Sequence, residues 1–152
     1  MAPLPDDPRG ILMLPNGKLL FRQISPGKVK ADGPGRSNFI PEDGIGLSTR
    51  REDMGAKEAF DAHIALCGPG KSLGTWGVTV AEADNLGLPA YDDEHLPDTP
   101  PFHVSIHFPP GGRRAHEKLA LGLHGHAKRR GWLYQPPTAS GGTITVGMIT
   151  TT

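Results

Sequence analysis

The chain has little of what stabilises small secreted proteins or anchors proteins in membranes. Its single cysteine, Cys67, cannot form an internal disulfide, so we expect a reducing cytoplasm. No apolar run approaches the roughly 18 residues that span a bilayer, and no charged segment followed by an apolar one opens the chain. We therefore expect neither a membrane partner nor a signal peptide. Aromatic residues make up only 6% of the chain, which predicts a modest core.

Glycine and proline are plentiful instead. With 21 glycines and 16 prolines among 152 residues, much of the chain should form loops. The length suits one domain that buries a core without metals or disulfides. We predict a flexible N-terminal arm over residues 1–9, a single α+β domain over 10–136 and a Thr-rich tail over 137–152.

The charge is balanced overall but unevenly distributed. The first 100 residues hold 10 Lys and Arg against 15 Asp and Glu, whereas residues 101–152 hold 6 against 1. Such polarity can steer an anionic partner, or it can let the two parts attract each other within the fold. Both interpretations stay open at this point.

Hydrophobic periodicity outlines the fold. Apolar residues recur at helical spacing over 53–67 and 113–130. A two-residue alternation predicts strands at 75–81 and 102–108. We predict a single compact α+β domain, with a mixed or antiparallel sheet of about five strands and two main helices, joined by long Gly/Pro-rich loops.

Local signals predict three finer features. The Asn-Gly pair that begins at Asn16 lies between two apolar runs and is typical of a β-hairpin. The loop over 25–46 should contain a short strand near 37–39. Thr49 and Glu52 have the spacing of a capping box that would begin the first helix.

One nucleotide-binding motif is excluded by the order of the elements. Residues 65–72, ALCGPGKS, fit the loose form of a phosphate-binding loop, which needs a strand before it and a helix after it. Here a helix precedes the motif and a strand follows it. We therefore predict that Gly68 ends a helix with a positive φ.

Five of the seven histidines lie between residues 103 and 126, but no zinc-ligand spacing occurs among them. His103 and His107 are four residues apart on a strand, or roughly 13 Å, which is too far to share an ion. The segment HVSI, which begins at His103, resembles one half of the signature of two-histidine phosphoesterases. That resemblance implies an acid–base role for His103, yet only one copy is present. His103 can equally be a hydrogen-bonded residue on a half-buried face.

A second resemblance concerns Arg22, the LST segment at Ser48, and a later glutamate, Glu82 or Glu94. Their order is similar to the Arg, Ser-Thr-Ser and Glu positions of some ADP-ribosyltransferases. The resemblance implies that Arg22 holds the phosphates of NAD, that Ser48 braces the site and that the glutamate orients a ribose hydroxyl. The second serine is missing. Arg22 can instead pair with a carboxylate, and outside this hypothesis we expect no cofactor.

Cations and an aromatic residue gather on and after the second helix. The residues concerned are Lys118, Lys128, Arg129, Arg130 and Trp132. This combination is typical of nucleic-acid sites, although four cations are few for a chain with a pI near 7.1. A solvated helix end explains them equally well.

Two further resemblances concern longer stretches. The segments LLFRQISP, GTWGVTVAEADNLGLP and RGWLY resemble a family of small bacterial proteins over about residues 18–135, which implies a stand-alone domain of an accessory or conflict-related locus and assigns no catalytic residue. The tail, GGTITVGMITTT, is similar to the modified core of a ribosomally made peptide precursor. That similarity implies a leader domain whose tail a separate enzyme modifies.

Three functional hypotheses follow. The first is a non-enzymatic binding module that meets a protein or an anionic ligand through loop 25–46 and the basic helix 113–130. The second is an enzyme acting on a phosphorylated or NAD-type ligand, with Arg22, Ser48 and His103 as candidate catalytic residues. The third is the peptide-precursor leader.

Overall fold

The computed structural model describes residues 7–137, so most of the predicted arm and tail lies outside the described residues. Short 3-10 helices, labelled η, punctuate the strands and helices. In chain order the elements are β1 (Ile11–Leu12), β2 (Leu19–Gln23), η1 (Pro26–Lys28), β3 (Val29–Lys30), β4 (Gly33–Pro34), η2 (Arg36–Phe39), β5 (Gly46–Arg51), η3 (Glu52–Met54), α1 (Ala56–Cys67), β6 (Thr75–Thr79), α2 (Val80–Asn85), β7 (Ala90–Asp92), β8 (His103–His107) and α3 (Arg113–Arg130).

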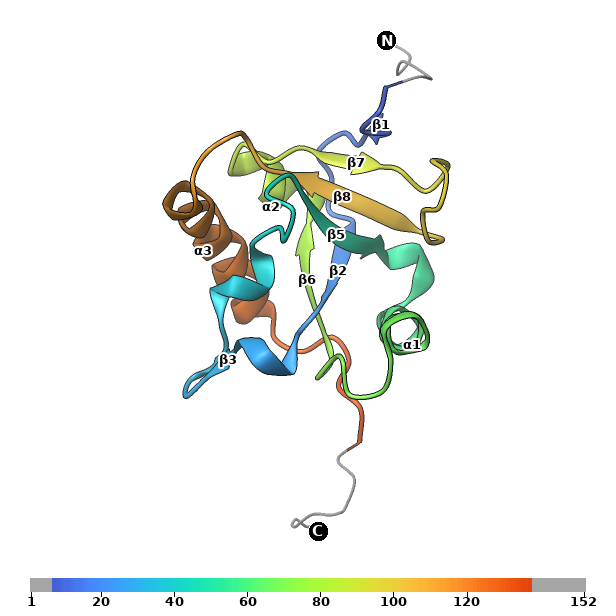
Figure 1. The fold of residues 1–152 in the computed structure, drawn as a ribbon, viewed down its shortest axis with the longest axis vertical. Helices are drawn as coiled ribbons and strands as arrows, with labels where there is room; N and C mark the ends of the chain where they lie inside the picture. Colours follow the sequence, from blue (N-terminus) through green and yellow to red (C-terminus); the bar gives the residue numbers. More distant parts are fainter. Residues whose placement is uncertain (1–6, 138–152) are drawn as a thin grey trace.

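One antiparallel sheet of six strands forms the centre of the molecule, in the order β1-β7-β8-β5-β2-β6. The helices α1 and α3 lie on opposite faces of this sheet (Figure 1). Adjacent residues of β6 illustrate the division, because Thr75 donates a hydrogen bond to the α1 residue Ala56 while Trp76 packs against His124 of α3. The predicted α+β fold with two main helices is thus confirmed.

The face under α3 holds the hydrophobic core. Alternation along the strands directs one set of apolar side chains toward this helix. The buried strand residues of this set are Leu20, Leu47, Val78, Val104 and Ile106, and α3 contributes Ala120, Leu123 and Ala127 to the same layer. Each buried Leu, Val or Ile contributes about 1.5–3 kcal/mol relative to an exposed one, so this layer stabilises the domain.

The opposite face of the sheet is polar over β5 and β8. Ser48, Arg50, His103 and Ser105 share it, since Ser48 pairs with Ser105 and Arg50 with His103. The helix α1 covers only one end of this face. Of its own residues, only Ala59 is buried. This thin cover leaves space between α1 and the sheet.

Several predictions of local structure are confirmed. The predicted helix 113–130 coincides with α3, and the helix predicted over 53–67 is α1. Gly68 ends α1 with a φ of 113°, and its N–H donates to the Ile64 carbonyl at 2.8 Å. The Gly-rich segment therefore follows a helix and leads into a strand, as the exclusion of a phosphate-binding loop requires.

Other local predictions are wrong. The hairpin at Asn16 does not form, because β1 pairs with β7 while β2 pairs with β5 and β6. The strand predicted near 37–39 is the 3-10 helix η2, in which the buried Asn38 side chain donates to the carbonyls of Lys28 and Gly35. Buried side-chain hydrogen bonds of this kind favour a compact turn over an extended strand.

The prediction that a capping box begins α1 is also wrong. Thr49 is buried in β5 and donates to the Val104 carbonyl, so it cannot cap α1. A capping box does form at Thr79 and Glu82, where it begins the unpredicted helix α2. Within residues 7–137, none of the helices has the length and apolar character needed to cross a membrane.

Candidate functional site

Two neighbouring strands of the sheet, β2 and β5, separate after two residue pairs. β2 and β5 pair only at Leu20 with Arg51 and at Phe21 with Arg50. The next residue of β2, Arg22, lies in this split: its Nε donates to the Asn38 carbonyl at 2.7 Å and its Nη1 to the Ser48 carbonyl at 3.0 Å. At this point a hydrogen bond from the guanidinium to Ser48 of β5 replaces the backbone hydrogen bonds between β2 and β5.

The guanidinium of Arg22 stays charged, and only some of its N–H donors are used within the described residues. Burial lowers the pKa of Arg22 to about 10, and the nearby Glu42 carboxylate opposes this shift. The group is still protonated at neutral pH. A guanidinium carries five N–H donors, and two of them donate to Asn38 and Ser48; the other three have no recorded partner in the described part of the chain.

A cavity of about 570 Å³ opens at this split, between α1 and the polar face of the sheet. Its charged lining is mostly cationic. The cations are Arg22, Lys28, Arg50 and Lys71, whereas Glu42 is the single carboxylate among the described lining residues. Glu42 itself lies 3.5 Å from Lys28 Nζ, so part of the lysine charge is neutralised.

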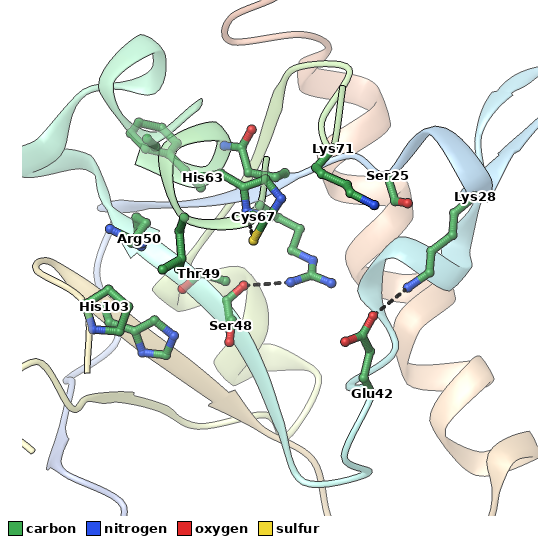
Figure 2. Close-up of a pocket in the computed structure, with 16 residues that line it drawn as sticks. Ser25, Lys28, Glu42, Ser48, Thr49, Arg50, His63, Cys67, Lys71 and His103 are labelled. Carbon is green, nitrogen blue, oxygen red and sulfur yellow. Dashed lines mark hydrogen bonds and ion pairs between the residues drawn. The ribbon is translucent and has the colours of Figure 1, made fainter. Parts of the chain in front are cut away.

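The cavity is extended, with different groups at its two ends (Figure 2). His103 and Arg50 lie at one end, and Lys28 and Glu42 lie at the other, with Ser48 between them. Burial lowers the pKa of Arg50, whose Nη1 donates to the Pro101 carbonyl at 3.0 Å. Arg50 is therefore held at this end by a hydrogen bond to the backbone.

One wall of the cavity is apolar. Phe21, Ala59, Leu66 and Pro100 contribute to it. Leu66 is 68% exposed although it is a large apolar side chain. A ring-shaped ligand group stacked here would remove this surface from water.

The His103 imidazole is held by a partly buried carboxylate. Asp93 Oδ1 lies 2.7 Å from His103 Nδ1, and the Ser105 hydroxyl donates to Asp93 Oδ2 at 2.8 Å. The side chains of His103 and Asp93 are each only 13% exposed. Burial acts to raise the pKa of Asp93, but the hydrogen bonds from His103 and Ser105 outweigh it and hold the pKa below its usual range. Nδ1 of His103 is consequently the protonated nitrogen.

Sequence reasoning missed a second imidazole, His63 of α1, which also lines the cavity. Its Nδ1 lies 3.9 Å from Cys67 Sγ, and Cys67 is exposed. Burial lowers the pKa of His63, and the positive charges of Arg22 and Arg50 act in the same direction. The spacing of residues 63 and 67 on one helix face was the available signal, but nothing in the sequence indicated that this face borders a cavity.

The structure brings the three candidate catalytic residues to one cavity. Arg22, Ser48 and His103 all line it. Arg22 donates to the backbone carbonyl of Ser48. The Ser48 hydroxyl therefore does not hold the guanidinium as the resemblance implied. Neither candidate glutamate is part of the lining: Glu82 caps α2 and pairs with Arg130, while Glu94 pairs with Arg51.

The predicted basic surface lies elsewhere, and much of its charge is engaged. Arg130 pairs with Glu82 at 2.8 Å, Arg129 Nη2 lies 2.9 Å from His126 Nδ1, and Lys128 lies 3.9 Å from Asp32. Lys118 is exposed on α3.

The aromatic member of that predicted surface, Trp132, packs edge-on against the buried Trp76 with ring centroids 5.5 Å apart. None of these five predicted binding residues lines the cavity. Loop 25–46, by contrast, reaches it through Ser25, Lys28 and Glu42.

Over the described range 7–137, the structure contains no group of three or more His, Cys, Asp or Glu side chains that could hold a metal ion. Comparisons with protein-family models, with curated proteins and with solved structures found no match. The tail on which the peptide-precursor hypothesis depends lies outside the described residues.

Proposed function

We propose that the chain binds a nucleotide-like ligand, with phosphate groups and a ring, in the cavity between α1 and the split of β2 and β5. One observation carries the proposal: four cationic side chains and one carboxylate line the cavity, and three N–H donors of one of these cations, Arg22, have no recorded partner within residues 7–137. An anionic ligand would compensate this charge.

Phosphate is the anion that suits this arginine best. Arg22 is fixed by two backbone carbonyls, so its planar donors are ordered before a ligand binds. A guanidinium donates two parallel hydrogen bonds to phosphate oxygens, and a preordered one loses less entropy on binding. The exposed Lys71 supplies a second positive charge in the cavity lining.

The apolar wall supports a ligand with a ring rather than phosphate alone. The cavity volume of about 570 Å³ falls inside the roughly 300–1,000 Å³ typical of small-molecule sites. Leu66, which is exposed, offers an apolar surface against which a base can pack. The combination of cations and an apolar wall therefore favours a nucleotide.

The proposal keeps one half of the binding-module hypothesis. Loop 25–46 contributes to the cavity, whereas the basic residues of α3 do not line it. NAD belongs to the proposed ligand class. Because neither Glu82 nor Glu94 lines the cavity, we propose NAD as a ligand that binds there and not as the substrate of an ADP-ribosyl transfer. A bacterial accessory or conflict-related setting in a reducing cytoplasm remains part of the proposal.

Calorimetric titration with ADP and with inorganic phosphate tests the proposal. We expect ADP to bind more tightly than phosphate, because only ADP also covers the apolar wall. Lys71→Gln should weaken ADP binding by about tenfold, or ~1.4 kcal/mol. Lys118→Gln is the matched control, since Lys118 is also exposed but lies on α3, and it should leave ADP affinity unchanged.

A second comparison separates the cavity from the basic helix. Changing Lys128, Arg129 and Arg130 together to Ser should leave ADP affinity and its salt dependence unchanged. If this triple variant loses affinity while Lys71→Gln does not, the ligand binds at the end of α3 and the proposal is wrong.

A further inference from the structure

We propose further that His63 of α1 is a binding residue of the cavity, and that it takes up a proton when an anionic ligand binds there. His63 is then a further cation around the bound phosphate groups. This inference rests on the proposed function, because the negative charge that draws the proton belongs to the nucleotide-like ligand. It adds that the affinity for this ligand depends on pH.

The position of His63 connects it to the proposed phosphate site. Its side chain lines the cavity and is partly exposed, so it can exchange protons with the solvent. In the view of Figure 2, His63 lies between Arg50 and Lys71. A phosphate group held by these cations would therefore lie close to the imidazole.

The groups that face His63 carry mostly positive charge. Burial lowers the pKa of His63, and Arg22 of β2 and Arg50 of β5 act in the same direction. The segment after α1 contributes Lys71 to the same lining, and a hydrogen bond with the Lys71 backbone acts in the opposite direction. On α1 itself, Cys67 Sγ lies 3.9 Å from Nδ1 of His63.

The carboxylate of the cavity does not balance a charge on His63. Glu42 is the single carboxylate among the described lining residues, and it lies 3.5 Å from Lys28 Nζ at one end of the cavity. A proton on His63 would thus add positive charge to a site that already holds an excess of it. In the free protein the imidazole is therefore neutral at neutral pH.

A bound diphosphate reverses this balance. A negative charge within about 4–6 Å favours the protonated form of an imidazole, so the pKa of His63 should rise on binding. The proton comes from the buffer, and the imidazolium then donates a charge-assisted hydrogen bond to a phosphate oxygen. Because the complex binds more protons than the free protein, the affinity falls as the pH rises from the pKa of the free state through that of the complex.

Two other histidines serve as comparisons. His103 also lines the cavity, but its Nδ1 already lies 2.7 Å from the Asp93 carboxylate, so the ligand changes the charge around it less. Burial lowers the pKa of His107 as well, but His107 does not line the cavity. Proton uptake through His63 should therefore persist when either of these histidines is replaced.

Calorimetric titration with ADP in two buffers of different ionisation enthalpy counts the protons taken up. The terminal phosphate of ADP also titrates in this range, so the native protein is compared with His63→Gln. We expect the native protein to take up more protons, by up to about one. Both proteins should bind ADP equally at about pH 8, whereas near pH 6 the native protein should bind about three- to tenfold more tightly.

Two further variants sharpen the comparison. His63→Lys carries a fixed charge, so it should lose the extra proton uptake and bind ADP more tightly than the native protein at about pH 8. His107→Gln is the matched control and should keep the full uptake. Thermal unfolding checks that each variant is folded under the conditions of the titration.

The single cysteine of the chain shows independently whether ADP occupies the cavity. Cys67 is exposed and lines it, so bound ADP should slow its alkylation by iodoacetamide. Equal proton uptake by the native protein and His63→Gln, with Cys67 protected, would overturn the inference and leave the proposed function standing. Loss of the uptake in His103→Gln but not in His63→Gln would overturn it as well. Absence of both binding heat and protection would remove the proposed function instead.

Discussion

The two faces of the central sheet differ in polarity and in how completely a helix covers them. The face under α3 is apolar and closed, with Leu20, Leu123 and Ile106 fully buried. The face under α1 is polar and open, and its helix buries only Ala59. Both faces belong to the same strands, because alternate residues point to opposite sides.

This difference shows that neighbouring residues of one strand have different roles: one residue stabilises the core, and the next faces the cavity side of the sheet. Val104 and Ile106 of β8 build the core, while His103 and Ser105 between them face Asp93. The polar face can therefore change its side chains without disturbing the core. Four experiments, from the largest expected effect to the smallest, can break or sharpen this separation.

The strongest test compares one leucine from each helix. Leu123→Ala removes a fully buried side chain of α3 and should lower the free energy of unfolding by about 2–5 kcal/mol. Leu66→Ala removes an exposed side chain of α1 and should change it by less than about 0.5 kcal/mol. Urea unfolding measures both.

ADP titration of the same pair completes the comparison. Leu66→Ala should weaken binding, and Leu123→Ala should not do so at temperatures where it stays folded. The separation fails if Leu66→Ala destabilises the protein as much as Leu123→Ala does.

Arg22 is the residue where the two roles meet, and Arg22→Lys should affect both. A lysine cannot donate to the Asn38 and Ser48 carbonyls with the same geometry, so we expect a loss of about 1–3 kcal/mol in stability. ADP affinity should fall by at least about tenfold as well. Arg114→Lys, at an exposed arginine of α3, provides the control and should alter neither quantity. Normal stability of the Arg22 variant would show that the split does not depend on its guanidinium.

Removing the cap of α2 should have a moderate effect on stability alone. Thr79 accepts a hydrogen bond from the Glu82 N–H at 3.0 Å, so Thr79→Ala should cost about 1 kcal/mol. ADP affinity should not change, since neither residue lines the cavity. Chemical unfolding followed by titration checks this, and a loss of affinity would couple α2 to the site.

The smallest effect concerns the pH dependence of stability through His63. Burial and the charges of Arg22 and Arg50 lower its pKa in the folded state, so below its ordinary pKa the unfolded state binds more protons. Its contribution to stability is present above that value and is lost as the pH falls through the lowered pKa. His63→Gln should flatten this part of the unfolding curve, although His107, whose pKa burial also lowers, will leave a residual slope. An unchanged curve would contradict the shift.

The apolar face could be predicted from the sequence, whereas the polar face could be predicted only in part. The periodicity of α3 and of β8 is long and regular, so both elements were found. The strand β7 was missed because it has three residues inside an acidic, Pro-rich stretch. The helix α2 was missed because Val78 and Val80 continue the alternation of β6, although Thr79 and Glu82 carried the capping signal.

The candidate site shows the same limit. Arg22, Ser48 and His103 were singled out by their residue types, and all three line one cavity. Their common location depends on the split of β2 and β5, which pairs only two residues of each strand. No local pattern encodes that split. For the same reason, the contributions of His63 and Lys71 became visible only in three dimensions.

A crystal structure of the protein grown with saturating ADP tests the central claim most directly. We expect a phosphate oxygen within hydrogen-bond distance of the Arg22 guanidinium and the adenine against Leu66. An empty cavity at saturating ADP, or ADP bound beside Arg129 and Arg130, would contradict it.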